Sequence, residues 1–168
     1  GCLNMNASGS GYVTLPNVGV SAGSARSISA WIYPTAASGI RTIVRWGSSS
    51  NEGGCGLSFN VNTKDIYFGF NNDDWYTSNN VAPLNQWTHV VFTYAGGTTS
   101  SATVKIYING VSQVLSKAGV MNSPNTANSN YAIGEDIVTT GRAFTGLIDD
   151  VRIYNRALTA NEANDLYI

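Results

Sequence analysis

Short segments in which apolar and polar residues alternate recur along most of this chain, and their period of two most limits its possible folds. Residues 57–61 and 65–70 alternate most strictly, and Ile66, Phe68 and Phe70 fall on one face of the second segment. Because successive side chains of a β-strand point to opposite faces, each segment predicts a strand with one buried face. Further segments rich in β-branched and aromatic residues predict strands at 27–33, 41–46, 87–94 and 144–154.

A tight turn is predicted at Asn109-Gly110, between the strand segments 104–108 and 111–114. A two-residue type I′ turn needs positive φ at both central positions, and Asn followed by Gly is the pair that favours it. Clusters of Gly, Ser, Asn and Thr predict loops between the other strands, and 71–74 is one of these clusters.

Only the C-terminal end of the chain predicts a helix. Thr159, followed three residues later by Glu162, matches a capping box, and the helix should end near Leu166. About a dozen short strands with one short C-terminal helix indicate an all-β fold, an antiparallel two-sheet β-sandwich. The 168 residues contain no obvious linker or repeat, so we expect a single domain spanning 1–168.

The charge balance argues against several kinds of partner. The net charge is −1 and 11% of the residues are charged, against about 25% in an average globular protein. The sequence has no Lys/Arg-rich stretch, so we expect no nucleic-acid binding. It has no apolar run of roughly 18 residues either, so we expect no membrane insertion. A polar surface of Ser, Thr, Asn and Gly is typical of secreted or cell-surface proteins.

Four segments resemble a known family. They are 27–34 (SISAWIYP), 85–94 (NQWTHVVFTY), 104–110 (VKIYING) and 146–158 (GLIDDVRIYNRAL). In content and order they resemble the laminin-G-like jelly rolls of the concanavalin A-like lectin/glucanase superfamily, in their bacterial form. The resemblance implies the jelly-roll form of the sandwich. It does not imply one activity, because this fold hosts lectins, binding modules, hydrolases, lyases and adhesion domains.

The two cysteines, Cys2 and Cys55, do not have the spacing of a metal site. In a chain of extracellular composition we expect them to form a disulfide, which would close a loop of about fifty residues. Two buried thiols are the alternative.

Catalytic groups are scarce in this sequence, which predicts that the protein is not an enzyme. A glycosidase needs two carboxylates about 5–10 Å apart. Asp73-Asp74 and Asp149-Asp150 are adjacent pairs, so on strands the members of each pair would face opposite ways. His89, the single histidine, lies within an apolar strand segment, where we expect it to make a structural hydrogen bond.

Two polar segments with aromatic residues predict a sugar-binding surface, because glycan sites combine aromatic rings with planar polar side chains. One is 71–76, and the other places Arg142 near Glu135-Asp136. Trp46 is a third candidate, beside Gly47, whereas Trp31 and Trp87 are assigned to the core. The predicted ligand-binding residues are Asn71, Asp73, Trp75, Tyr76, Arg142 and Trp46.

The family resemblance also implies a structural Ca²⁺ ion. Asp149 occupies the position of the family's metal ligand in the last strand, and backbone oxygens near 4–6 and 39–41 would complete the shell. The alternative is that Asp149 and Asp150 bind Arg152, Arg156 or backbone N–H groups instead.

These observations favour a non-catalytic carbohydrate-binding, lectin-like module of a larger secreted or surface protein, with neighbouring domains in a longer chain. Its partner would be a glycan or a cell-surface glycoprotein. The alternative is a protein-binding or adhesion domain of a cell-surface adhesin or pilus-like protein, which the same uncharged polar composition fits equally well.

Overall fold

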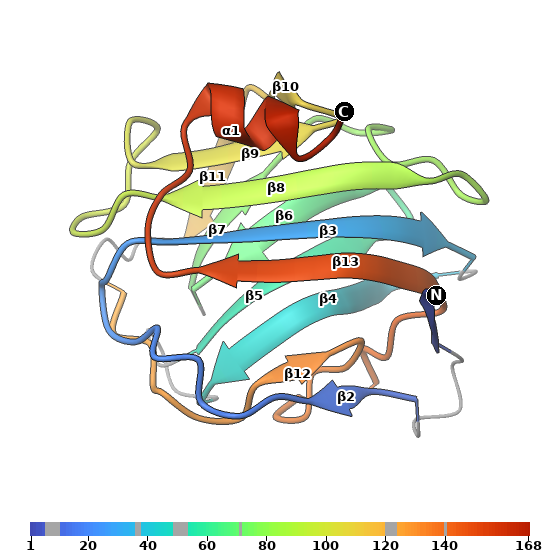
Figure 1. Ribbon diagram of the computed structural model, residues 1–168, viewed down its shortest axis with the longest axis horizontal. Helices are drawn as coiled ribbons and strands as arrows, with labels where there is room; N and C mark the ends of the chain where they lie inside the picture. Colours follow the sequence, from blue (N-terminus) through green and yellow to red (C-terminus); the bar gives the residue numbers. More distant parts are fainter. Residues whose placement is uncertain (6–10, 36–37, 49–53, 71, 120–123, 140) are drawn as a thin grey trace.

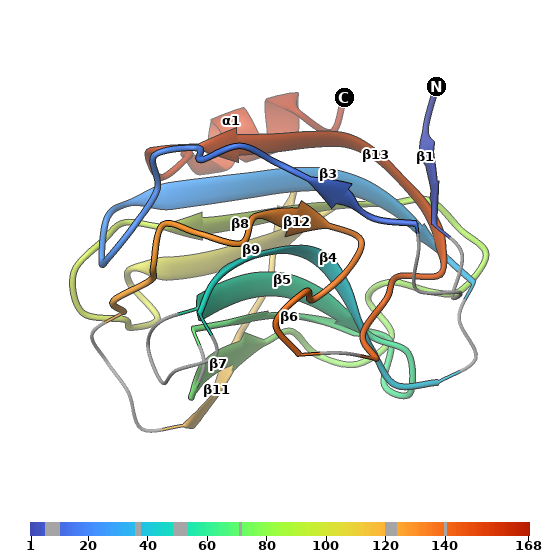
Figure 2. The same ribbon diagram turned by 90° about the horizontal axis from the view of Figure 1, so that it is seen from below.

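Two antiparallel β-sheets packed face to face form the body of the protein, and one short helix lies against the outer face of one of them (Figures 1 and 2). The computed structural model describes residues 1–5, 11–35, 38–48, 54–70, 72–119, 124–139 and 141–168. The predicted all-β sandwich with a short C-terminal helix is therefore confirmed.

The sheet nearer the viewer in Figure 1, here called the front sheet, has six strands within the described residues, in the order β1-β13-β3-β8-β9-β10. Their bounds are β1 (Leu3–Met5), β13 (Gly146–Tyr154), β3 (Arg26–Pro34), β8 (Thr88–Tyr94), β9 (Val104–Ile108) and β10 (Val111–Ser112).

The back sheet has seven strands in the same described ranges, in the order β11-β7-β6-β5-β4-β12-β2. Their bounds are β11 (Ser116–Gly119), β7 (Asp73–Tyr76), β6 (Asp65–Gly69), β5 (Gly54–Asn60), β4 (Ile40–Gly47), β12 (Ala132–Ile133) and β2 (Val13–Thr14). Both sheets curve in the same sense, so the outer face of the back sheet is concave and that of the front sheet is convex (Figure 2).

The core lies between the sheets and is formed by the alternating apolar residues. Phe68 of β6 stacks on Phe92 of β8 with ring centroids 3.4 Å apart, which joins the two sheets directly. Phe70 meets both rings edge-on. Full burial of one such side chain stabilises the fold by about 1.5–3 kcal/mol. The faces predicted for 57–61 and 65–70 are confirmed, because their apolar residues all belong to this core.

The predicted Asn109-Gly110 turn is confirmed between β9 and β10. Its φ angles are 49° and 77°, the positive pair of a type I′ turn. The Asn109 side chain also contributes, because its Oδ1 accepts a hydrogen bond of 2.8 Å from the backbone N–H of His89. The turn is thereby tied to the neighbouring strand β8.

The single helix described, α1 (Ala160–Asp165), has the predicted capping box. The Thr159 hydroxyl accepts from the Glu162 N–H, and the Glu162 carboxylate accepts from the Thr159 N–H. Leu158 and Ala163 pack on outward-facing apolar side chains of the front sheet. This helix is too short to cross a membrane, and no other described segment forms a helix long and apolar enough to do so.

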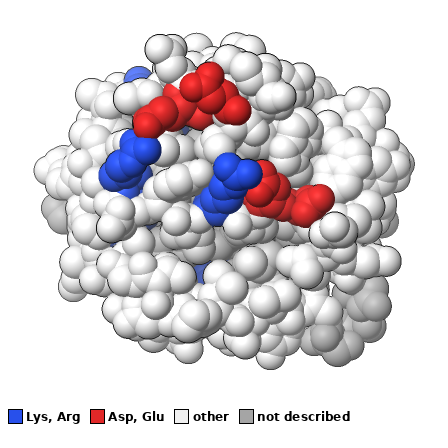
Figure 3. Space-filling model, viewed as in Figure 1, with Lys and Arg blue, Asp and Glu red and all other residues white. Residues whose placement is uncertain are grey.

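Charges on the outer face of the front sheet occur as neighbouring acidic and basic side chains rather than as a patch of one sign (Figure 3). Arg152 pairs with Asp150 at 2.8 Å, and Arg156 pairs with Glu162 at 2.7 Å. This arrangement does not provide the row of cations that binding to a phosphate backbone requires.

Candidate functional site

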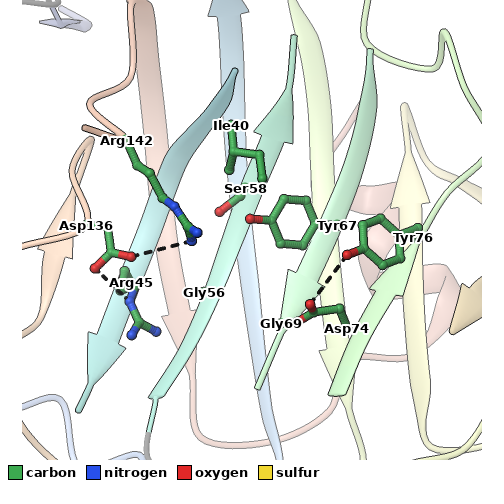
Figure 4. A pocket seen from close by; sticks show the side chains of 10 residues that line it. All are labelled: Ile40, Arg45, Gly56, Ser58, Tyr67, Gly69, Asp74, Tyr76, Asp136 and Arg142. Atoms are coloured by element: carbon green, nitrogen blue, oxygen red, sulfur yellow. Dashed lines mark hydrogen bonds and ion pairs between the residues drawn. The ribbon is translucent and has the colours of Figure 1, made fainter. Parts of the chain in front are cut away.

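A groove crosses the outer, concave face of the back sheet (Figure 4). Its volume is about 230 Å³, and strands β4 to β7 supply its floor. Two residues that follow β12, Asp136 and Arg142, close one side. The full lining is Ile40, Arg45, Gly56, Ser58, Tyr67, Gly69, Asp74, Tyr76, Asp136 and Arg142.

The strand register explains the shape of the floor. Arg45, Gly56, Gly69 and Asp74 are direct neighbours across four adjacent strands. Side chains of residues opposite one another point to the same face, and the two central glycines leave room for the Arg45 and Asp74 side chains to lie over Gly56 and Gly69. The next row, Ser58, Tyr67 and Tyr76, borders this glycine row with three hydroxyl groups.

An irregularity in β4 places Arg45 on this face. The register against β5 shifts between Thr42 and Val44, which inserts one extra residue into β4. A β-bulge of this kind reverses which residues face outward beyond it. Thr42 and Arg45 therefore lie on the same outer face although their numbers differ by three.

A buried carboxylate organises the first wall of the groove. Asp136 is 1% exposed, and its Oδ1 accepts from the Arg45 Nε at 2.9 Å. The same oxygen accepts from the backbone N–H groups of Val138 and Thr139 at 3.1 and 2.9 Å. Arg142 approaches the other oxygen, Oδ2, at 3.8 Å, and 40% of the Arg142 side chain is exposed. Two guanidinium groups thus share one carboxylate.

The opposite wall consists of two stacked tyrosines and one carboxylate. The rings of Tyr67 and Tyr76 are 5.2 Å apart and 25° from parallel. The Tyr76 hydroxyl donates to Asp74 Oδ2 at 3.4 Å. Burial and the nearby Asp74 charge raise the pKa of Tyr76 to about 12, so its hydroxyl keeps its proton at neutral pH. Burial also raises the pKa of Asp74 above its ordinary value.

The structure brings together Tyr76 and Arg142, which come from the two separate segments predicted from the sequence. Trp75 and Asp73 do not join them, because the predicted loop at 71–74 contains the start of strand β7. On that strand Asp74 and Tyr76 face the groove, whereas Asp73 and Trp75 face inward and are 0% and 4% exposed. The predicted ligand role of Asp73 and Trp75 does not fit this burial. Asn71 lies outside the described residues.

The buried positions on β7 have partners of their own. Asp73 forms an ion pair of 3.1 Å with Lys117 of β11 and accepts from the Thr99 hydroxyl. The Lys117 ammonium lies over the Trp75 ring, 5.5 Å from its centroid. These contacts compensate the cost of burying a carboxylate and hold β7 inside the sheet.

The predicted ligand role of Trp46 does not fit its burial, and the predicted core position of Trp87 is wrong. Trp46 is 0% exposed, stacks on Tyr131 and donates its indole N–H to the Val20 carbonyl at 3.1 Å. Trp87 is 41% exposed on the front sheet, where it packs edge-on against Tyr33. Trp87 directly precedes β8, and its alternation places the ring on the outer side.

Asp74 and Asp136 lie within the two predicted segments, whereas three other polar groove residues, Arg45, Ser58 and Tyr67, lie outside both. Ser58 and Tyr67 alternate with the core residues of their own strands, so the same period of two that assigns the core also assigns them to the outer face. Arg45 had no such signal, because the bulge in β4 breaks the alternation.

The predicted disulfide is not formed, and both cysteines are free thiols. Cys2 is exposed at the start of the chain, whereas Cys55 is buried in the core. Burial raises the pKa of the Cys55 thiol to about 11. The guanidinium of Arg26 lies 3.5 Å from its sulfur. Cys55 is therefore a core residue in this structure.

The structural role predicted for His89 is confirmed. Its Nε2 lies 2.9 Å from the Ser29 hydroxyl. Its ring packs against Trp31 and Tyr167 with centroids 5.0 and 6.1 Å away. Burial lowers the pKa of His89 to about 4, so the imidazole is neutral at physiological pH.

The predicted calcium ligand, Asp149, lies in β13 of the front sheet opposite Trp31, whereas Gly39 directly precedes β4 of the back sheet, and residues 40 and 41 begin that strand. Its Oδ1 accepts from the Asp150 N–H at 2.9 Å, and Asp150 pairs with Arg152, as in the alternative interpretation. Across the described residues, no three His, Cys, Asp or Glu side chains gather as a metal site. Calcium binding stays a prediction.

Comparison with protein families agrees with this architecture. A family model described as the concanavalin A-like lectin/glucanases superfamily matches residues 7–164. This chain belongs to that superfamily. The resemblance in the segments 27–34, 85–94, 104–110 and 146–158 is thereby confirmed. A comparison with curated protein sequences finds no match.

Several solved structures share the fold of this superfamily member. Domain 4 of AbnA, a GH43 extracellular arabinanase from Geobacillus stearothermophilus solved in complex with arabinotriose, is 26% identical with a TM-score of 0.69. That match covers 99% of this chain and 76% of the other. A putative carbohydrate-binding protein from Bacteroides ovatus is 21% identical, with a TM-score of 0.69 and coverage of 91% and 43%.

A third similar structure is the CBM40 of Ruminococcus gnavus IT-sialidase bound to α2,3-sialyllactose. It is 14% identical with a TM-score of 0.68, and the match covers 86% of this chain and 83% of the other. At 21% and 14% identity, the second and third structures show that the superfamily fold is shared.

Proposed function

We propose that this chain is a non-catalytic carbohydrate-binding module of a larger secreted or cell-surface protein, and that the groove on the back sheet binds the glycan. The observation that carries this proposal is the convergence of Tyr67, Tyr76, Ser58 and Arg142 in one groove on the concave face. The groove is open and its lining is rich in hydroxyl and charged groups, which matches the many hydroxyls of a sugar.

Each part of the groove corresponds to a need of sugar recognition. The half-buried ring of Tyr76 presents apolar surface together with a hydroxyl that donates at neutral pH. Arg142 supplies planar N–H donors, and Asp74 supplies acceptor oxygens for sugar hydroxyls. The two glycines let the Arg45 and Asp74 side chains lie close to the sheet, which keeps the floor of the groove low.

The similarity to domain 4 of the arabinanase AbnA supports the same function. That domain was solved with arabinotriose, and its likeness to this chain extends over 99% of the chain at 26% identity. We therefore infer that the partner of this chain is a glycan rather than a ligand of another chemical class.

The arrangement of carboxylates supports a non-catalytic role. Two acidic residues line the groove, but Asp136 is 1% exposed and its Oδ1 accepts three hydrogen bonds. A carboxylate that is buried and bonded in this way does not reach a sugar carbon, so Asp74 would lack the second carboxylate that glycoside hydrolysis requires.

Binding of purified protein to a panel of polysaccharides and oligosaccharides tests the proposal. We expect one glycan class to bind, and Tyr76→Ala to weaken binding at least about tenfold, the loss of roughly 1.4 kcal/mol. Trp87→Ala is the matched control, because it removes an exposed ring from the other sheet. Silence across the panel, together with binding to a cell-surface protein, would instead establish the adhesion alternative.

A further inference from the structure

The Arg142 side of the groove carries more positive than negative charge. Arg45 and Arg142 both face Asp136, so this trio carries one excess positive charge, and the fourth charged lining residue, Asp74, lies on the opposite wall. Arg45 is the main partner, with its Nε at 2.9 Å, whereas Arg142 approaches no closer than 3.8 Å. At that distance the contact is an ion pair without a hydrogen bond. In the described part of the chain it is the one polar contact of the Arg142 guanidinium, so its N–H donors are available to a ligand.

The Arg142 guanidinium faces two hydroxyl groups across the groove. It lies near Gly56, between Asp136 on one side and the hydroxyls of Ser58 and Tyr67 on the other (Figure 4). Ser58 and Tyr67 are direct neighbours on β5 and β6, so their side chains point to the same face. A ligand group between the Arg142 guanidinium and these residues would therefore meet one cation and two hydroxyl groups together.

Arg142 is held in place by β4. The guanidinium of Arg41 donates to the carbonyl oxygens of Gly141 and Ala143, each at 3.4 Å. The backbone N–H of Thr42 donates to the Arg142 carbonyl at 2.8 Å. The backbone is thus fixed at three successive residues, and Arg142 is presented with little freedom to lose when a ligand binds.

We propose that the glycan bound by this groove contains an acidic sugar, whose carboxylate is bound by Arg142 above Gly56. This inference rests on the proposed function and adds the chemical class of the ligand. Arginine forms two parallel hydrogen bonds with a carboxylate, a geometry that neutral sugar hydroxyls do not reproduce. The sugar's hydroxyls would face the other wall, where the oxygens of Asp74 and of Tyr76, whose hydroxyl donates to Asp74, offer acceptors.

Pairs of ligands that differ in the ionised carboxylate provide the test. Polygalacturonate is compared with its methyl ester, and sialyllactose with its sialic acid methyl ester, by isothermal titration calorimetry at low salt. We expect at least one acidic ligand to bind about tenfold more tightly than its neutral counterpart, as a charged hydrogen bond implies. Which pair responds separates a uronic acid from a sialic acid as the recognised residue.

Variants assign the effect to Arg142. Arg142→Gln should remove the preference for the acidic ligand and its dependence on salt, whereas Arg142→Lys should retain part of both. Arg152→Gln is the matched control, since it removes an exposed arginine from the front sheet and should leave binding unchanged. Unchanged melting temperatures show that each variant is folded.

The outcomes separate this inference from the function on which it rests. If the charged and the neutral ligands bind equally and Tyr76→Ala still weakens binding, the acidic-sugar proposal is overturned. The proposed carbohydrate-binding function then remains. Preference for the acidic ligand that survives in Arg142→Gln overturns the assignment to Arg142. Absence of binding to any glycan overturns both proposals.

Discussion

At the scale of single residues, the groove contains a carboxylate that is costly to keep ionised. Burial raises the pKa of Asp74, so the folded chain holds this proton more tightly than the unfolded chain does. Ionisation of Asp74 therefore destabilises the fold above its raised pKa, and this penalty is relieved as the pH falls toward the ordinary value of 3.8.

The variant Asp74→Asn tests this assignment. It should raise the melting temperature at pH 7, because the amide still accepts from Tyr76 without carrying a charge. The difference from the wild type should shrink as the pH is lowered toward 4. A variant that is less stable at pH 7 would show that the carboxylate stabilises the groove.

His89 predicts a second dependence on pH. Its pKa is lowered by burial from 6.5 to about 4, so the unfolded chain binds a proton in this range and the folded chain does not. The free energy of unfolding should therefore decrease as the pH falls from 6.5 to 4. Urea titrations of the wild type and His89→Gln across this range measure the effect, and an equal decrease in both proteins would exclude His89 as its origin.

At the scale of elements, the β9–β10 hairpin depends on Asn109 for two reasons, its positive φ and its bond to the His89 N–H. Asn109→Gly keeps the φ preference but loses the bond, which should cost about 1 kcal/mol. Asn109→Ala loses both, which should cost about 2–3 kcal/mol. Thermal unfolding of the two variants measures the difference, and equal losses would show that the φ angle carries no cost.

Strands whose apolar residues alternate could be predicted from the sequence, and β7 could not. Its residues, Asp73 to Tyr76, have two acidic side chains at the start, which is typical of a loop. The strand forms because Lys117 and Thr99 compensate Asp73 inside the sandwich, and β11, which brings Lys117, is not visible as a strand in the sequence either. Ion pairs and hydrogen bonds with residues that are distant in the sequence leave no pattern in the residues of the strand itself.

The same limit explains which groove residues were found. Tyr76 and Arg142 stand in polar, aromatic segments that are typical of binding loops, and the structure places them in one groove. Burial of a tryptophan depends on which face of its strand is covered. Trp46 therefore looks exposed beside a Gly/Ser run but is buried, whereas Trp87 is exposed beside β8.

At the scale of the whole molecule, the two sheets should unfold together because one aromatic cluster joins them. Phe92 of the front sheet contacts both Phe68 and Phe70 of the back sheet. Phe92→Ala should destabilise the protein by about 3–5 kcal/mol, the usual cost of removing a buried aromatic ring. Calorimetry should show a single transition at lower temperature, and two separate transitions would mean that the sheets are independent units.

The most direct test of the account is to map the ligand on the molecule by ¹⁵N–¹H NMR during titration with a glycan that binds. The groove predicts that the largest shift changes fall on backbone amides of Gly56, Ser58, Gly69 and Tyr76, on the concave back sheet. Shift changes centred instead on the front sheet, around Trp87 and Asp149, with the groove amides unaffected, would contradict the proposal that this groove is the binding site.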